Sequence, residues 1–181
     1  MSDPTPIPAE AYPALAAWQA DPTVQAALAA SDWKTAFSTY RYLEAGDPPF
    51  TPLRKPLREA TITAITSGGL YIAGEQPPFD AADVYGDASM RLIPTGTPNE
   101  RIKLAHDHYD HTVPDQDLNT ISPAQTLIGL QREGQIGAVA PYMVSTHGYI
   151  PVWTRALDGL IPAVLNFLHT HPTDAALLVP V

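Results

Sequence analysis

The sequence has 181 residues, 45% of them hydrophobic, which is enough for one domain with a buried core. Its net charge of −9, with ten scattered basic residues, gives no electrostatic footprint for a nucleic-acid or anionic-membrane partner. It contains no cysteine, so these residues supply no disulfide, no thiolate metal ligand and no cysteine nucleophile.

The start of the sequence, Met1-Ser2-Asp3-Pro4, has neither the basic stretch nor the apolar segment of a signal peptide. No apolar run approaches the roughly 20 residues that a membrane-spanning helix needs. We therefore predict a cytoplasmic protein with no membrane partner.

Residues 9–45 are predicted to be helical, because apolar side chains recur there at helical spacing. Asp21-Pro22 is typical of a helix start, with a capping carboxylate followed by proline at the first helical position. Ser31 or Asp32 is expected to cap a third helix, which would carry Trp33, Phe37, Tyr40 and Leu43.

Residues 46–58 form a proline-rich connector, and the character of the sequence changes after it. We predict two parts: residues 1–57, a helical extension with its connector, and residues 58–181, an α/β domain. Ala60 to Thr66 is rich in β-branched residues and predicts a strand that enters the turn Ser67-Gly68-Gly69.

Strands and helices alternate through the rest of the sequence. The predicted strands lie near residues 90–93, 101–106, 136–140, 142–145 and 174–181, and the predicted helices near 122–134 and 153–168, the second kinked or divided at Pro162. This alternation predicts an α/β fold with a mostly parallel sheet and helices on both faces, plus an N-terminal helical extension.

The last predicted strand is continuously apolar from Ala175 to Val179. Such a segment is typical of a strand buried in the middle of a parallel sheet. Ligands of open α/β sheets bind at the carboxyl ends of central strands, so we expect a functional loop to follow this one. Two interpretations are open: a genuine C-terminal strand, or a longer ancestor or gene product that has been cut.

The densest chemical feature is His106-Asp107-His108-Tyr109-Asp110-His111, which reads H-x-H-x-D-H. On an extended segment His106, His108 and Asp110 point to one face. The pattern resembles the metal-binding signature of the metallo-β-lactamase superfamily, which implies zinc or iron and a metal-activated hydroxide. We favour no metal cofactor here, because the chain is short for that fold. The alternative is zinc or iron on His106, His108, Asp110, His111 and His147.

A second set of short motifs spans about residues 58–181. In order they are Thr66 to Tyr71 (TSGGLY), Pro78-Phe79-Asp80, Gly86 to Pro94 (GDASMRLIP), Tyr109-Asp110, Asp117-Leu118-Asn119, Ser122-Pro123, Glu133 to Gly137 (EGQIG), Gly148-Tyr149-Ile150 and the closing Asp174 to Val181. Their order and spacing resemble the selenoprotein B family of glycine, sarcosine, betaine and D-proline reductases. In that family the closing strand runs directly into sequence that contains selenocysteine or cysteine.

The resemblance implies a dithiol-linked reductase, in which a selenolate or thiolate attacks an activated carbon of a small amino-acid or betaine-type substrate. A nucleophile of low pKa is essential to such chemistry, and this sequence has none, so its status as an enzyme is open. Three explanations are open: a selenocysteine codon read as a stop, a degenerate member with a binding or structural role, or a thiol supplied by a partner. The expected partners are a small-molecule substrate and other reductase-complex subunits or a second copy.

The candidate catalytic residues, for acid–base work, are His108, Tyr109 and Asp110. The candidate substrate-binding residues are those of the glycine turn, whose N–H groups suit a carboxylate, and a bidentate arginine: Ser67, Gly68, Gly69 and Arg91. The purely structural alternatives are a tight turn for the glycine segment and a salt bridge with Asp87 for Arg91. The hypotheses for function are a selenoprotein B-like subunit without its own nucleophile, a metal-dependent hydrolase, and a non-catalytic binding or complex subunit.

Overall fold

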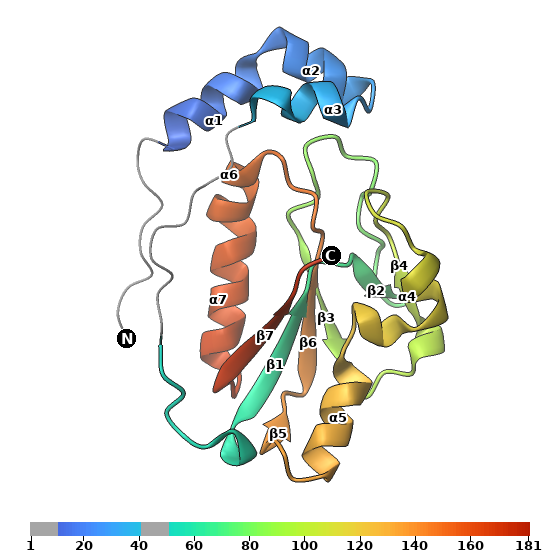
Figure 1. The fold of residues 1–181 in the computed structure, drawn as a ribbon, viewed down its shortest axis with the longest axis vertical. Helices are drawn as coiled ribbons and strands as arrows, with labels where there is room; N and C mark the ends of the chain where they lie inside the picture. The colour runs from blue at the N-terminus through green and yellow to red at the C-terminus, as the bar shows by residue number, and fades with distance from the viewer. Residues whose placement is uncertain (1–10, 41–50) are drawn as a thin grey trace. The chain divides into compact units, whose positions relative to one another are not determined.

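The computed structural model describes residues 11–40 and 51–181 (Figure 1). The chain divides into two compact units, Met1–Pro52 and Leu53–Val181, so the boundary lies within the predicted proline-rich connector. Each unit is described by itself. Among the described residues, no helix combines the length and the apolar character needed to cross a membrane.

The first unit contains α1 (Ala11–Ala20), α2 (Pro22–Ala29), α3 (Trp33–Ala36) and a 3-10 turn at Phe37–Thr39. The predicted start of the second helix is confirmed, because the Asp21 carboxylate accepts the Thr23 N–H at 2.7 Å. Asp32 caps the third helix by accepting the Thr35 N–H at 3.1 Å. That helix is shorter than predicted. Residues 9–10 and 41–45 of the predicted helical region lie outside the described residues.

The second unit is built on a five-stranded sheet around β1 (Thr61–Thr66). On one side of β1 lies β7 (Ala175–Val179), parallel to it. On the other side β5 (Ala138–Val139) and then β6 (Tyr142–Thr146) run parallel to its first and second halves. The outer strand β3 (Met90–Pro94) is antiparallel to β6. The mostly parallel sheet is therefore confirmed.

A small second sheet stands beside the first. Its strands β2 (Leu70–Ile72) and β4 (Ile102–Leu104) pair antiparallel, with Leu70 opposite Leu104. This pairing returns the chain after β4 to the point where β1 ends. Short helical elements join the strands of the unit: Leu57–Glu59, Asn99–Arg101, α4 (Thr112–Gln116) and Leu118–Thr120.

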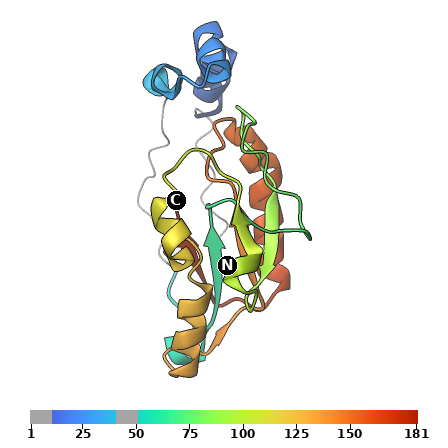
Figure 2. The ribbon, with the colours of Figure 1, turned by 90° about the vertical axis from the view of Figure 1, so that its right-hand side faces the viewer.

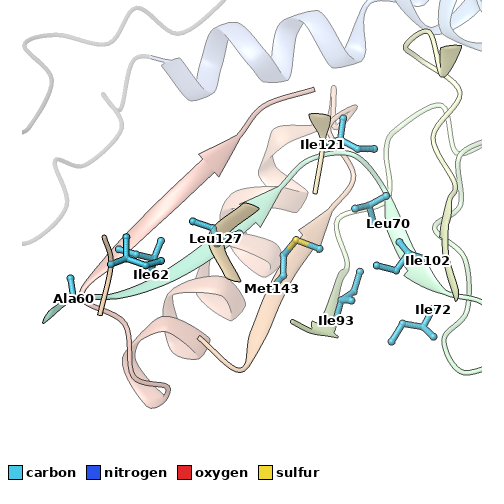
Figure 3. Close-up of a cluster of buried hydrophobic side chains, with 11 residues drawn as sticks. Ala60, Ile62, Leu70, Ile72, Ile93, Ile102, Ile121, Leu127 and Met143 are labelled. Carbon is cyan, nitrogen blue, oxygen red and sulfur yellow. The ribbon is translucent and has the colours of Figure 1, made fainter. Parts of the chain in front are cut away.

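Helices cover both faces of the main sheet, as predicted, with α5 (Ala124–Arg132) and α7 (Ile161–Thr170) on opposite sides (Figure 2). On the α5 face, Leu127 belongs to a buried apolar cluster with Ile62 and Met143 (Figure 3). Gly134 ends α5 at a φ of +70°, a conformation that favours glycine, which confirms the predicted helix end.

The predicted helix at 153–168 forms with an irregular start. It comprises α6 (Trp153–Arg155), a π-helical turn (Ala156–Leu160) and α7, so the predicted irregularity lies just before Pro162. Leu160 and Phe167 are buried apolar side chains of this region, whereas Ile161 and Leu165 are exposed.

The prediction of a buried central position for the last strand is wrong. β7 is an edge strand, because β1 is its only strand neighbour in the sheet described. Leu177 is 40% exposed and Leu178 is 67% exposed. Consecutive strand residues point to opposite faces, so neither face of β7 is fully covered. An apolar run indicates that burial of the strand is favourable, but it does not indicate the position of the strand in the sheet.

Candidate functional site

Three segments converge where β1 ends. The Ser67 N–H donates to the Val179 carbonyl at 3.1 Å, and Gly68 forms an isolated bridge with His147. The Gly69 N–H donates to the Thr146 carbonyl at 2.9 Å. On the other side, the Gly69 carbonyl accepts the Ala105 N–H at 3.0 Å, which leads directly to His106. The glycine turn thus ties the ends of β1, β4 and β6 together.

Two glycines make this close approach possible. Gly69 has a φ of +69°, and a Cβ there would lie 2.7 Å from the Ala105 carbonyl oxygen. Gly148 follows His147, and a Cβ there would lie 3.2 Å from Nε2 of His106 and 3.1 Å from the Ser67 carbonyl oxygen. The first glycine is required by conformation and by space, and the second leaves room beside the His106 ring.

The convergence gathers three imidazoles, those of His106, His108 and His147, each with a ring nitrogen within 4.8 Å of the others. His106 and His147 are 3% and 2% exposed, and their rings stack with centroids 4.0 Å apart. Nδ1 of His147 donates to the Tyr149 carbonyl at 3.0 Å. Within the described part of the chain, Nε2 of His106 and Nε2 of His147 are buried and have no hydrogen-bond partner.

Burial favours the neutral form of the His106 and His108 rings. It lowers the pKa of His106 to about 3, with smaller contributions from the neighbouring His147, His108 and His111. Burial is also the largest cause that lowers the pKa of His108, ahead of the nearby His147. A neutral imidazole carries a lone pair, so the His106 and His108 rings can each donate a lone pair to a metal cation at neutral pH.

The three predicted catalytic residues do not form one group. The ring of His108, which belongs to the cluster, stacks on that of Tyr149 with centroids 3.9 Å apart. The Tyr109 hydroxyl donates to the Gly68 carbonyl at 3.0 Å, and burial raises the pKa of that hydroxyl to about 12. The exposed Asp110 accepts the Thr112 N–H at 2.9 Å and the Thr112 hydroxyl at 2.6 Å.

His111 also lies outside the cluster, because its Nε2 donates to the His106 carbonyl at 2.6 Å. The H-x-H-x-D-H segment therefore splits. Its first two histidines join His147, whereas its last two residues, Asp110 and His111, brace the backbone of the segment. The expected strand periodicity fails here because β4 ends at Leu104 and the chain then turns.

The predicted substrate-binding turn uses its polar groups inside the protein. The Gly68 N–H donates to the Thr66 hydroxyl at 3.1 Å, and the N–H groups of Ser67 and Gly69 donate to carbonyls of β7 and β6. The Ser67 hydroxyl accepts the Val181 N–H at 2.9 Å. The N–H groups that the sequence offered to a ligand are thus already bonded, and the turn holds the histidines in place.

Arg91, the fourth predicted substrate contact, is held within its own loop. Its guanidinium donates to the carbonyls of Pro77, Pro78 and Met90 and to the Ser89 hydroxyl, at 2.7 to 3.1 Å. It lies 4.2 Å from the centroid of the Phe79 ring and 4.0 Å from the Asp87 carboxylate. The sequence-level alternative of an Arg91–Asp87 ion pair matches this geometry.

The loop fixed by Arg91 also reaches the histidines. The Phe79 ring lies 6.1 Å from that of His147, and the Tyr149 hydroxyl donates to the Val84 carbonyl at 3.2 Å. A Cβ on Gly86, whose φ is +82°, would lie 2.4 Å from the Tyr149 carbonyl oxygen. Sequence analysis assigned no site role to Tyr149 or Gly148. The signal that could have identified them is their position immediately after a strand and a histidine.

Comparison with known proteins defines the class. The model of the family "Glycine/sarcosine/betaine reductase selenoprotein B" matches residues 28–157, well over half of the chain. The chain belongs to this family, as the sequence motifs indicated. No solved structure is significantly similar to the chain.

Three relatives are reductase components. The D-proline reductase subunit gamma of Acetoanaerobium sticklandii is 28% identical over 138 residues, which cover 76% of this chain and 55% of that protein. The glycine reductase complex component B subunit gamma of Carboxydothermus hydrogenoformans is 30% identical over 55% of this chain and 23% of that protein. The betaine reductase complex component B subunit beta of Peptoclostridium acidaminophilum is 29% identical over 52% and 22%.

The chain therefore spans about half the length of the first relative and under a quarter of the other two. The family match, together with the separation of Asp110 and His111 from the cluster, removes the basis for a dinuclear metallo-β-lactamase-like hydrolase. Three of the five alternative metal ligands do come together: His106, His108 and His147.

Proposed function

We propose that this chain is a selenoprotein B-like subunit of a dithiol-linked reductase that acts on small amino-acid or betaine-type substrates, and that the redox nucleophile comes from outside these 181 residues. The observation that carries the proposal is the family match over residues 28–157 of a chain that contains no cysteine. The relatives named after D-proline, glycine and betaine support the substrate class.

The proposed binding region is the carboxyl edge of the sheet, beside the turn Ser67-Gly68-Gly69. His108 and Tyr149 are among the side chains of this region that are only partly buried. Their stacked rings offer an aromatic face to a substrate ammonium group. Tyr109, whose hydroxyl bonds to the Gly68 carbonyl, positions the glycine turn in this proposal, and Asp110 caps the start of α4.

The proposed partners are other subunits of a reductase complex, because the relatives are named as subunits or components. The exposed Leu177 and Leu178 on edge strand β7 support a surface that another chain covers. A cytoplasmic location stays a prediction from the sequence.

The proposal is tested by ligand binding and turnover measured separately. Saturation-transfer NMR on the purified chain is expected to detect binding of glycine, sarcosine, betaine or D-proline, and His108→Ala is expected to weaken it. His169→Ala, an exposed histidine on α7 outside this region, is the matched control and should leave binding unchanged.

Turnover with dithiothreitol is expected only after a selenocysteine- or cysteine-bearing reductase component is added. Absence of binding for all four compounds, in the chain alone and with that component present, would overturn the substrate assignment. Reduction by the chain alone with dithiothreitol would overturn the assignment of the nucleophile to a different polypeptide segment.

A further inference from the structure

We propose that His106, His108 and His147 form a mononuclear site for a divalent transition-metal ion, zinc or iron(II). The first two residues follow β4 and the third follows β6, so the ion would join segments that lie far apart in the sequence. One nitrogen of each ring lies within 4.8 Å of one nitrogen of the other two, and the stacked His106 and His147 rings would rotate so that both face one ion. The proposal does not depend on the reductase function, and its readouts are metal content and spectra.

The strongest observation is a pair of orphaned nitrogens. Nε2 of His106 and Nε2 of His147 are buried without a hydrogen-bond partner among the described residues, although both side chains are more than nine-tenths buried. A buried polar atom without a partner costs roughly 1–3 kcal/mol, and native proteins avoid it. Two such atoms at one place indicate that a bonding partner for these rings is missing from the cluster.

His147 is set up as a metal ligand. Its Nδ1 lies 3.0 Å from the Tyr149 carbonyl oxygen, which only accepts, so the ring proton is on Nδ1. Nε2 therefore carries a lone pair, and it is buried without a hydrogen-bond partner among the described residues. A metal-bound histidine almost always donates its other ring N–H to a carbonyl or carboxylate, which is the arrangement of this residue.

His106 must give up one long hydrogen bond. Its Nδ1 accepts the His108 N–H at 3.2 Å, which puts the proton of the neutral ring on Nε2. Coordination through Nδ1 replaces this bond, and coordination through Nε2 moves the proton to Nδ1 and also breaks it. In both cases the ring exchanges a weak contact for a bond to the ion and keeps one N–H on its other nitrogen.

The donor set selects the ion. Three neutral imidazoles suit zinc or iron(II), whereas magnesium and calcium prefer oxygen ligands. The carboxylate of the H-x-H-x-D-H segment is not a member, because Asp110 is bonded to Thr112. Three protein ligands leave a position for water or a small anionic ligand, as in catalytic rather than structural zinc sites.

Space and charge are also compatible with a cation. Gly148 leaves the volume beside the His106 ring open, since a Cβ at Gly148 would sit 3.2 Å from Nε2. The net charge of the sequence is −9, which favours cation binding over the protein as a whole.

The test uses the full chain, stripped with a chelator and dialysed. Titration with zinc sulfate, followed by gel filtration and elemental analysis, is expected to give about one zinc per chain. Cobalt(II) is expected to bind at the same site and to show visible absorption bands of a four- or five-coordinate ion. His108→Phe, which keeps an aromatic ring on Tyr149, and His147→Gln are each expected to lower zinc affinity at least tenfold.

The matched control is His169→Ala, which removes an exposed histidine on α7 and should leave zinc affinity unchanged. Asp110→Ala and His111→Ala should still retain one zinc, because these residues brace the segment and are not ligands. Failure of the wild-type chain to retain zinc or iron(II) at ten-micromolar free metal would overturn the proposal without reference to any variant. Two ions per chain, or loss of metal in Asp110→Ala but not in His147→Gln, would overturn it in favour of the sequence-local ligand set.

Discussion

The two sides of β1 carry parallel strands that differ in environment. On one side, Met143, Val144 and Ser145 of β6 are at most 2% exposed, whereas on the other side Leu177 and Leu178 of β7 are 40% and 67% exposed. The histidine cluster forms on the β6 side, where β4 and the glycine turn also end. The buried end of β6 therefore positions the histidine cluster, whereas the apolar side chains of β7 on the far side are exposed.

The largest expected effect distinguishes these two sides by truncation. Met143→Ala removes a side chain from the buried cluster and is expected to lower the free energy of unfolding by about 2–5 kcal/mol. Leu178→Ala is expected to change it by less than about 0.5 kcal/mol, because the side chain is mostly exposed. Urea unfolding of both variants measures the difference. Equal losses would show that β7 is covered in the isolated chain.

The second test concerns the turn on the buried side. Gly69→Ala is expected to cost roughly 2–5 kcal/mol, from a left-handed φ and a close approach to the Ala105 carbonyl. Gly74→Ala is the matched control: its φ is +79°, but a Cβ there has nothing within 4 Å, so only about 1–2 kcal/mol is expected. Thermal unfolding ranks the two, and the opposite ranking would contradict the convergence at Gly69.

The third test separates two roles for Arg91, which lies on β3 opposite Ser145 of β6. Arg91→Lys cannot reproduce the contacts to three carbonyls and Ser89, so unfolding is expected to be easier by about 1–2 kcal/mol. Arg132→Lys, on the exposed face of α5, should be neutral. A variant of unchanged stability that loses substrate binding would restore the direct substrate contact predicted from the sequence.

The smallest expected effect is a pH dependence at the start of β7. Asp174 is hydrogen-bonded to Lys55 and to the Thr61 N–H, and these bonds hold the pKa of its carboxyl below its usual value. Because the folded state binds the proton less readily, this stabilisation is present above the ordinary pKa of 3.8 and is lost as the pH falls below it.

Asp174→Asn is therefore expected to be less stable than wild type at pH 7, and the difference should shrink as the pH approaches 3. Urea midpoints at both pH values measure it. A difference that is independent of pH would show that the Asp174 carboxylate does not anchor β7 to β1.

Local patterns in the sequence were sufficient for much of the fold. The β-branched run before Ser67 predicted β1, Asp21-Pro22 predicted the start of α2, and Gly134 predicted the end of α5. These features depend on the conformation of neighbouring residues, which short motifs determine. The alternation of strands and helices then predicted that the sheet is mostly parallel.

The site depended on pairings that no local pattern determines. His147 meets His106 only because β6 pairs with β1 while β4 pairs with β2, and both pairings join distant segments. On an extended H-x-H-x-D-H segment, Asp110 would share a face with His106 and His108. The chain instead turns after β4 ends at Leu104, and Asp110 bonds to Thr112. The apolarity of Ala175 to Val179 likewise carried no information about which strand would flank it.

The measurement that tests the central claim most directly is a zinc-edge anomalous difference map from a crystal of the chain grown with one equivalent of zinc. We predict a single strong peak about 2.0–2.1 Å from one ring nitrogen each of His106, His108 and His147. Absence of a peak among these three rings, or a peak bound by Asp110 and His111 instead, would contradict the account.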